Sequence, residues 1–143
     1  MANGIIYSLD ACIKQLDEHI DGEYVDEEVT RVLSNNIAAI DSLIECVRAA
    51  INVKHIGNVT PLLKIIFSNN ELVGHRYDDI DECLLIIIDH LLRVRNREYS
   101  KQIFEVLDNC NLGLVYAYTV IDHVGVNWRD YIYIPEEYVR ALL

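Results

Sequence analysis

Hydrophobic residues recur at intervals of three and four along most of this chain, and residues that interrupt helices are rare. Glycine occurs six times and proline twice in 143 residues. Runs that alternate apolar and polar residues, as strands do, are nearly absent. A spacing of i, i+3, i+4 and i+7 places apolar side chains on one face of an α-helix. The sequence therefore predicts an all-α protein of many short helices with short connections.

Five hydrophobic stripes mark the expected helices. They are Ile5, Leu9, Cys12, Ile13, Leu16 and Ile20; Ile37, Ile40, Leu43, Ile44 and Val47; Leu84, Leu85, Ile88, Leu91 and Leu92; Ile103, Phe104, Val106 and Leu107; and Leu114, Val115, Tyr118 and Ile121. A last helix is expected at the end of the chain, where Pro135 suits the first helical position. Glu136 and Glu137 follow it, and the positive end of a helix dipole favours such acids in the first turn.

Short sequence elements recur at long intervals. LSNN at 33–36 returns as FSNN at 67–70, 34 residues later, and LDNCN at 107–111 is a looser echo. A second element, an asparagine between two apolar residues and followed by a charged one, occurs in AINVKH at 50–55 and GVNWRD at 125–130. Its asparagines, Asn52 and Asn127, lie 75 residues apart. That distance is about two periods of 33 plus an insertion, and such periods are typical of stacked helical repeats.

The stretch INVKHIGNVTPLLKIIFSNN, residues 51–70, resembles the ankyrin repeat. The Thr-Pro-Leu at 60–62 matches the start of the family's TPLH motif, and Leu63 stands where the family has histidine. The Ile-Asn at 51–52 matches the Val-Asn that ends a typical repeat. Asn58 stands where the family usually has a loop glycine, with Gly57 one place earlier, and asparagine tolerates the left-handed backbone of such a loop. Locally, the threonine is expected to cap a helix and the proline to lie in its first turn.

The resemblance implies a short stack of helix–turn–helix ankyrin-like repeats with capping helices at both ends, in a single domain of residues 1–143. Its parts are an N-terminal capping helix at 1–22, degenerate repeats at 27–55, 56–99 and 100–130, and a C-terminal capping helix at 135–143. The segment RVRNREYSK, residues 93–101, is expected to replace the hairpin that normally joins two repeats. A non-repeat helical bundle is the alternative, because residues 126–129 resemble the Asn-Trp-Gly-Arg motif of virus-type apoptosis regulators without its glycine.

The charge of the chain excludes several classes of partner. Asp and Glu number 23 against 12 Lys and Arg, a formal net charge of −11. Nucleic acids and anionic membrane surfaces attract clustered basic residues, so neither is expected to bind. The longest apolar run, at 84–88, is about five residues, and the N-terminus lacks the basic region of a signal peptide. The four cysteines lie in helical stretches without a CxxC pair, which is typical of reduced thiols in a cytoplasmic protein.

Motifs for catalysis, phosphate binding or metal binding are absent from the sequence. The chain is therefore predicted not to be an enzyme and to need no small-molecule substrate, metal or cofactor. The pairs Asp89–His90 and Asp122–His123 join a carboxylate to an imidazole. Neighbouring side chains on a helix point about 100° apart, however, so the members of each pair are not expected to face each other.

Eleven of the 23 acids fall in two segments, residues 17–28 and 78–82. The segment 17–28 is interpreted as a solvated loop, and the acids of 78–82 as residues that favour the start of the following helix. The alternative for both segments is a surface to which a basic partner binds. The aromatic residues near the C-terminus are equally suited to bind a partner or to close the end of the stack. The basic patch of Arg93, Arg95, Arg97 and Lys101 is either an anion site or paired internally and solvated. The candidate partner-binding residues are Asp17, Glu18, Asp21, Glu23, Asp26, Tyr77, Asp78, Asp79, Asp81, Glu82, Trp128 and Tyr131.

These features favour a non-catalytic protein-binding module. Long-range attraction between opposite charges speeds the encounter of two proteins, so a strongly acidic protein suits a basic partner. Small acidic immunity proteins of bacterial toxin systems bind nuclease-type toxin domains, and some of them are ankyrin-like. The leading hypothesis is such an immunity protein, which binds a basic toxin domain and blocks its active site. The alternative is a viral or bacterial ankyrin-like adaptor that binds a host regulatory protein.

Overall fold

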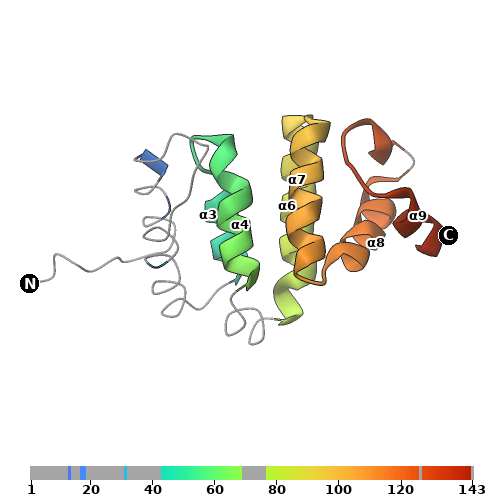
Figure 1. The fold of residues 1–143 in the computed structure, drawn as a ribbon, viewed down its shortest axis with the longest axis horizontal. Helices are drawn as coiled ribbons and strands as arrows, with labels where there is room; N and C mark the ends of the chain where they lie inside the picture. The colour runs from blue at the N-terminus through green and yellow to red at the C-terminus, as the bar shows by residue number, and fades with distance from the viewer. Residues whose placement is uncertain are drawn as a thin grey trace, which may run out of the picture. The chain divides into compact units, whose positions relative to one another are not determined.

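The computed structural model describes residues 43–68, 77–125 and 127–142, together with Ile13, Asp17, Glu18 and Arg31. Every regular element in these ranges is an α-helix or a short 3-10 helix, so the predicted all-α class is confirmed (Figure 1). The chain divides into two compact units, Met1–Ile80 and Asp81–Leu143. The expected single domain of residues 1–143 stays a prediction. Within the described ranges no helix is both long and apolar enough to cross a bilayer.

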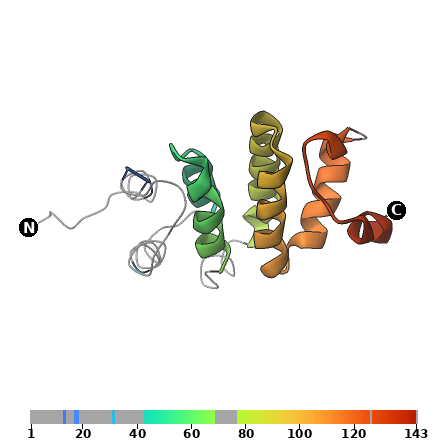
Figure 2. The same ribbon diagram turned by 45° about the horizontal axis from the view of Figure 1, so that its top comes forward.

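In the first unit, α3 (Leu43–Ile51) packs beside α4 (Val59–Ser68), and the 3-10 turn η2 (Ile56–Asn58) leads into α4 (Figure 2). Both helices bury one apolar face. The shared core includes Leu43, Cys46, Val47, Ala50, Val59, Leu62, Leu63 and Ile66. Pro61 lies in the first turn of α4, as the sequence predicts. Thr60 does not cap the helix, because its hydroxyl is buried inside the first turn without a hydrogen bond.

The second unit begins with an antiparallel pair of helices. The 3-10 turn η3 (Tyr77–Asp79) precedes α6 (Ile80–Val94), and α7 (Arg97–Asn109) follows after two residues. Arg95 has a left-handed backbone with φ 57° and its N–H donates to the carbonyl of Leu91, which ends α6. The Asn96 side chain accepts from the N–H of Tyr99 at 3.0 Å and caps α7. The nine-residue connection expected at 93–101 is therefore a two-residue turn, and the repeat boundary expected at 99/100 falls inside α7.

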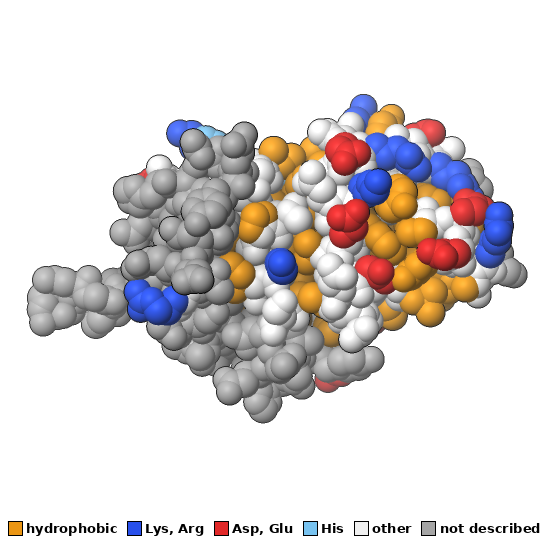
Figure 3. Space-filling model, viewed as in Figure 1, with side chains coloured by type: hydrophobic (Ala, Val, Ile, Leu, Met, Phe, Trp, Pro, Cys, Tyr) orange, Lys and Arg blue, Asp and Glu red, His pale blue; other side chains and the backbone are white. Residues whose placement is uncertain are grey.

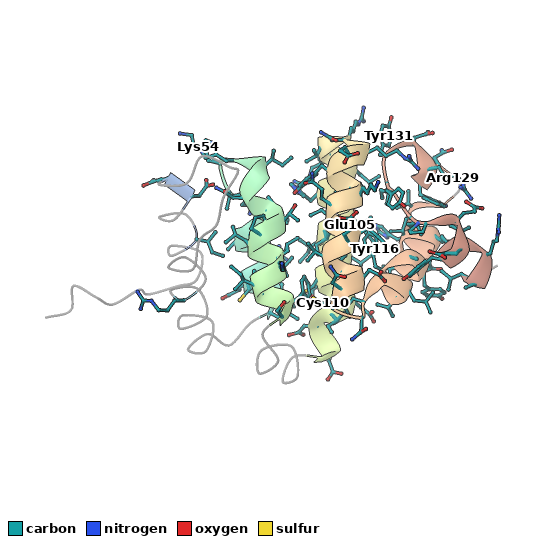
Figure 4. All side chains as sticks on the ribbon, in the orientation of Figure 1. Lys54, Glu105, Cys110, Tyr116, Arg129 and Tyr131 are labelled. Carbon is teal, nitrogen blue, oxygen red and sulfur yellow. The ribbon has the colours of Figure 1, made fainter. Side chains whose placement is uncertain are left out.

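A tight turn with a left-handed residue joins α7 to α8 (Gly113–Val124). Asn111 has φ 63°, and its N–H donates to the carbonyl of Asp108. The N–H of Leu112 donates to the carbonyl of Leu107 at 2.8 Å. These two bonds form a Schellman motif, in which asparagine is the usual substitute for glycine. The turn folds α8 back onto α7, and Tyr116 fills the space between them (Figure 4).

The end of the chain closes the core of the second unit. The 3-10 turn η4 (Trp128–Asp130) and α9 (Glu136–Leu142) both pack on α8. Buried residues from all parts of the unit form this core: Leu84, Ile87, Ile88, Leu91, Ile103, Phe104, Leu107, Tyr116, Val120, Trp128, Ile132, Ile134 and Val139. The last helix covers residues 136–142 of the expected 135–143. The carbonyl of Pro135 accepts from the N–H groups of Tyr138 and Val139, so Pro135 lies just before the first helical residue.

Candidate functional site

Helix α8 carries apolar residues on two faces, of which one is buried and the other exposed. Its buried residues are Gly113, Tyr116, Ala117 and Val120. On the outer face, Leu114, Val115 and Tyr118 are 51, 42 and 58% exposed. The stripe that marks this helix in the sequence is therefore the outer one. A soluble protein rarely exposes neighbouring large apolar side chains unless they bind something.

Part of this outer face lines a groove of about 430 Å³ between α8 and α6. The lining residues are Asp81 and Leu85 from α6, and Val115, Tyr118, Thr119, Asp122 and His123 from α8. Spacings of three and four residues bring them to one side of each helix. The Thr119 hydroxyl is used within α8, because it donates to the carbonyl of Val115 at 2.8 Å. The groove therefore presents mainly apolar side chains and carboxylates.

The carboxylates of the groove are available to a ligand. Among the described residues, neither Asp81 nor Asp122 forms an ion pair. Their side chains are exposed, so each keeps its hydration in the free protein. A positively charged group that enters the groove meets two carboxylates beside an apolar wall.

A weak pair links the two helices at the groove. Nε2 of His123 lies 3.3 Å from Oδ1 of Asp89, and both side chains are about half exposed, at 44 and 61%. A pair this exposed contributes about 1 kcal/mol or less to stability. The adjacent pairs in the sequence do not form, as expected, since His90 instead contacts the hydroxyl of Tyr99 at 2.7 Å in the core. The spacing of 34 residues between Asp89 and His123 gives no local signal.

The structure describes two residues of the first acidic segment, residues 17–28. Asp17 is helical, 4% exposed and hydrogen-bonded to the loop after α3, so its position differs from the exposed one that was expected. Its carboxylate is used inside the first unit rather than offered to a partner. Glu18 is exposed. The predicted residues Asp21, Glu23 and Asp26 lie outside the described residues.

The second acidic segment lies around the start of α6. Tyr77 begins the turn η3, in which Asp78 is exposed and Asp79 is half-buried. Asp81 and Glu82 follow in the first turn of α6, where both are exposed. Their negative charge suits the positive end of that helix, as one of the two sequence interpretations states. Among the predicted residues that the structure describes, Asp81 is the one that lines the groove.

The two predicted aromatic residues near the C-terminus, Trp128 and Tyr131, lie in the core and at its edge. Trp128 is 5% exposed and packs with η4 against α8, which fits the interpretation that aromatic residues close the end of the helical unit. Arg129 covers its ring, with the guanidinium carbon 4.6 Å from the ring centroid. Tyr131 is half-buried, and Arg95 lies 5.2 Å from its ring centroid.

Leu85, Val115, Tyr118 and Asp122 belong to the groove, and the sequence interpretation does not include them among the binding residues. The signal that could have identified them is the double apolar face of α8. A helix with apolar residues on both sides needs a partner for each side. Leu114 to Ile121 contains such a run, in which only Thr119 is polar.

Within the described ranges, no group of three or more His, Cys, Asp or Glu side chains is placed to hold a metal ion. Cys46 and Cys110 are free thiols, in α3 and at the end of α7. No protein-family model, no curated protein and no solved structure matches the chain. The ankyrin-like arrangement therefore stays a prediction from the sequence.

Proposed function

We propose that this protein is a non-catalytic binding module that neutralises a basic, nuclease-type toxin domain, as a cytoplasmic immunity protein of ankyrin-like type does. The observation that carries the proposal is the groove between α6 and α8. Its exposed apolar side chains and its carboxylates, Asp81 and Asp122, form a surface that suits a basic segment with an apolar side.

The apolar part of the groove supports affinity. Tyr118 is 58% exposed and is large enough to anchor an interface, as tyrosine commonly does. Val115 and Leu85 lie in the same lining, so a partner side chain placed there would lose contact with water on several sides. Covering apolar surface in this way stabilises a complex by about 25 cal/mol per Å² before the costs of association are subtracted.

The acidic part of the groove supports fast and selective association. With a net charge of −11, the whole chain attracts a basic protein over a distance of about one Debye length. Asp81 and Asp122 then meet the cationic groups of the partner locally. Nuclease domains are basic because they bind phosphate, and the same basic surface that holds the nucleic acid would be occluded in the complex.

The test is co-expression with the toxin domains encoded beside this gene. The expected result is rescue of growth and a purified complex with nanomolar affinity. The double variant Asp81→Asn and Asp122→Asn is expected to slow association about tenfold and to reduce its dependence on salt. Tyr118→Ala is expected to speed dissociation by a similar factor.

The matched control is the double variant Glu105→Gln and Glu137→Gln, which removes two exposed carboxylates of the same unit that do not line the groove. It should slow association much less, because the net charge changes equally while the groove is intact. If no neighbouring toxin domain is neutralised and none forms a complex with this protein, the proposed immunity function is wrong. Equal effects of the two double variants would place the interface elsewhere.

A further inference from the structure

Three cationic side chains gather where α6 ends and α7 begins, around two tyrosine rings. The guanidinium of Arg95 lies 5.2 Å from the ring centroid of Tyr131. Arg97 and Lys101 lie 5.6 and 5.7 Å from the ring centroid of Tyr133. Figure 4 shows Tyr131 beside this end of the helix pair, and Figure 3 shows Lys and Arg side chains together in the same part of the surface.

None of these three cations forms an ion pair with a carboxylate of the described residues. That is unusual in a chain whose acids outnumber its bases by 23 to 12. Arg129 shows the ordinary arrangement, since it lies over Trp128 and also donates to both carboxylate oxygens of Glu136. The cluster of Arg95, Arg97 and Lys101 is thus not explained by the internal pairing that the sequence allowed.

The tyrosine that holds two of the cations is fixed in place. The N–H of Tyr133 donates to the buried Ser100 hydroxyl at 2.9 Å, and its ring packs edge-on against Phe104 with centroids 5.9 Å apart. Arg97 and Lys101 are therefore held over a rigid surface rather than on a mobile segment. Attraction between a cation and the face of an aromatic ring stabilises this placement in the free protein.

The arrangement has two costs for the free protein. Arg97 and Lys101 are four residues apart on one helix, a spacing at which like charges destabilise the helix. Arg95 occupies a left-handed position, φ 57°, where a side chain crowds the backbone and glycine or asparagine is usual. A bound anion would offset the repulsion between Arg97 and Lys101. Its contact with Arg95 would be a gain that glycine at this position could not supply.

We infer that Arg95, Arg97, Lys101 and the ring of Tyr133 form a binding site for an acidic peptide segment of a partner protein. A single phosphate fits this surface less well. A phosphate at a helix start is held by free backbone N–H groups, and the N–H of Tyr99 at the start of α7 is already bonded to Asn96.

The spread of the cations matches several carboxylates rather than one anion. Arg95 lies over the ring of Tyr131, and the other two cations lie over the ring of Tyr133. Successive acidic residues of an extended segment can therefore each pair with a different cation. This site binds negatively charged groups, whereas the groove between α6 and α8 suits positively charged ones. The inference therefore does not depend on the proposed immunity function. The site recognises its ligand through the carboxylates that the ligand carries.

The test is a titration of the full chain with a fluorescent eight-residue peptide that alternates glutamate and glycine. Salt of about 0.1 M screens the distant acids of the chain, because the Debye length is then about 10 Å. The expected result is saturable binding that disappears when the glutamates are replaced by glutamine. The double variant Arg97→Gln and Lys101→Gln is expected to weaken binding at least about tenfold.

Arg95→Gly separates binding from folding. Glycine relieves the left-handed position, so the urea midpoint should be equal or higher while the peptide binds severalfold more weakly. The matched control is the double variant Arg129→Gln and Arg140→Gln, which removes the same charge from two exposed arginines of the second unit outside the cluster. Equal weakening in this control would overturn the proposal, as would the absence of saturable binding. Displacement of the peptide by equimolar inorganic phosphate would overturn the assignment to a peptide.

Discussion

The carboxylate of Asp17 accepts a hydrogen bond from the backbone N–H of Lys54, 37 residues further along the chain. The same carboxylate accepts from the N–H of His55 at 3.3 Å and from the side-chain amide of Asn58. Three donors therefore converge on one buried acid, which holds the loop between α3 and α4. Hydrogen bonds to an ionised carboxylate are about twice as strong as neutral ones.

Asp17→Asn is expected to lower the free energy of unfolding by about 2 kcal/mol. The amide removes the charge and brings an N–H₂ group against donors that need an acceptor. Denaturation in urea, followed by circular dichroism, measures the change. Glu18→Gln is the control, because Glu18 is exposed beside it and should leave the midpoint unchanged. A similar loss in both variants would contradict the role of Asp17 as a buried acceptor.

The stability of the protein is expected to fall as the pH is lowered through the range in which unfolded histidine titrates. Burial, with a smaller contribution from Arg93, lowers the pKa of His90 below its ordinary value of 6.5. Below that value the unfolded chain binds a proton that the folded His90 does not, so stability decreases by up to about 1.4 kcal/mol per pH unit. Above it the imidazole is neutral in both states and stability is unaffected.

The measurement compares urea midpoints of the wild type and His90→Gln between pH 7.5 and 5. The glutamine amide can still bond the Tyr99 hydroxyl but does not titrate, so the variant should lose less stability over this range. Identical pH dependence in the two proteins would show that His90 is protonated as readily when folded as when unfolded.

Gly113→Ala is expected to destabilise the second unit by about 1 to 2 kcal/mol. A Cβ at Gly113 would overlap the carboxylate of Asp108 and come within 3.1 Å of its Cβ. That carboxylate cannot swing away freely, since the Tyr138 hydroxyl donates to it and the bond raises the pKa of Tyr138.

A double-mutant cycle measures this clash. In an Asp108→Ala background the same Gly113→Ala change should cost much less, because the obstructing side chain is gone. Thermal unfolding of the four proteins gives the coupling energy. Equal costs in both backgrounds would mean that the helix start, rather than the contact with Asp108, requires glycine.

The cysteines should differ in reactivity toward alkylating agents. Burial in the first unit, reinforced by the neighbouring Glu45, raises the pKa of Cys46 to about 12. Cys110 lies half-buried at the end of α7. Because the thiolate is the reactive form, iodoacetamide at pH 8 should label Cys110 and leave Cys46 unmodified until urea is added. Peptide mapping by mass spectrometry distinguishes them, and early labelling of Cys46 would contradict its burial.

Local signals in the sequence predicted local structure. Pro61 marks the first turn of α4, and the stripe from Ile103 to Leu107 is buried in α7 as the periodicity indicates. These features depend on a few neighbouring residues, so the local sequence pattern is enough to predict them. The repeat resemblance involves longer distances. It did not anticipate that α7 follows α6 after two residues.

The site depends on which helices meet, and single-sequence periodicity does not contain that information. Both faces of α8 are apolar, so the pattern cannot tell that Tyr116 faces the core and Tyr118 does not. The same limit applies to charges. Asp17 belongs to an acidic run typical of a solvated surface, but the loop around Lys54 makes it a buried acceptor.

The short connections of the second unit have a consequence for the order of folding. Two residues join α6 to α7 and three join α7 to α8, so contacts in this unit are local and should form quickly. The contact between Asp17 and Lys54 closes a loop of 37 residues, which costs more chain entropy. During synthesis, however, the residues that form this slower contact leave the ribosome before the second unit does. The loop around Asp17 therefore has time to close before the fast-folding helices emerge.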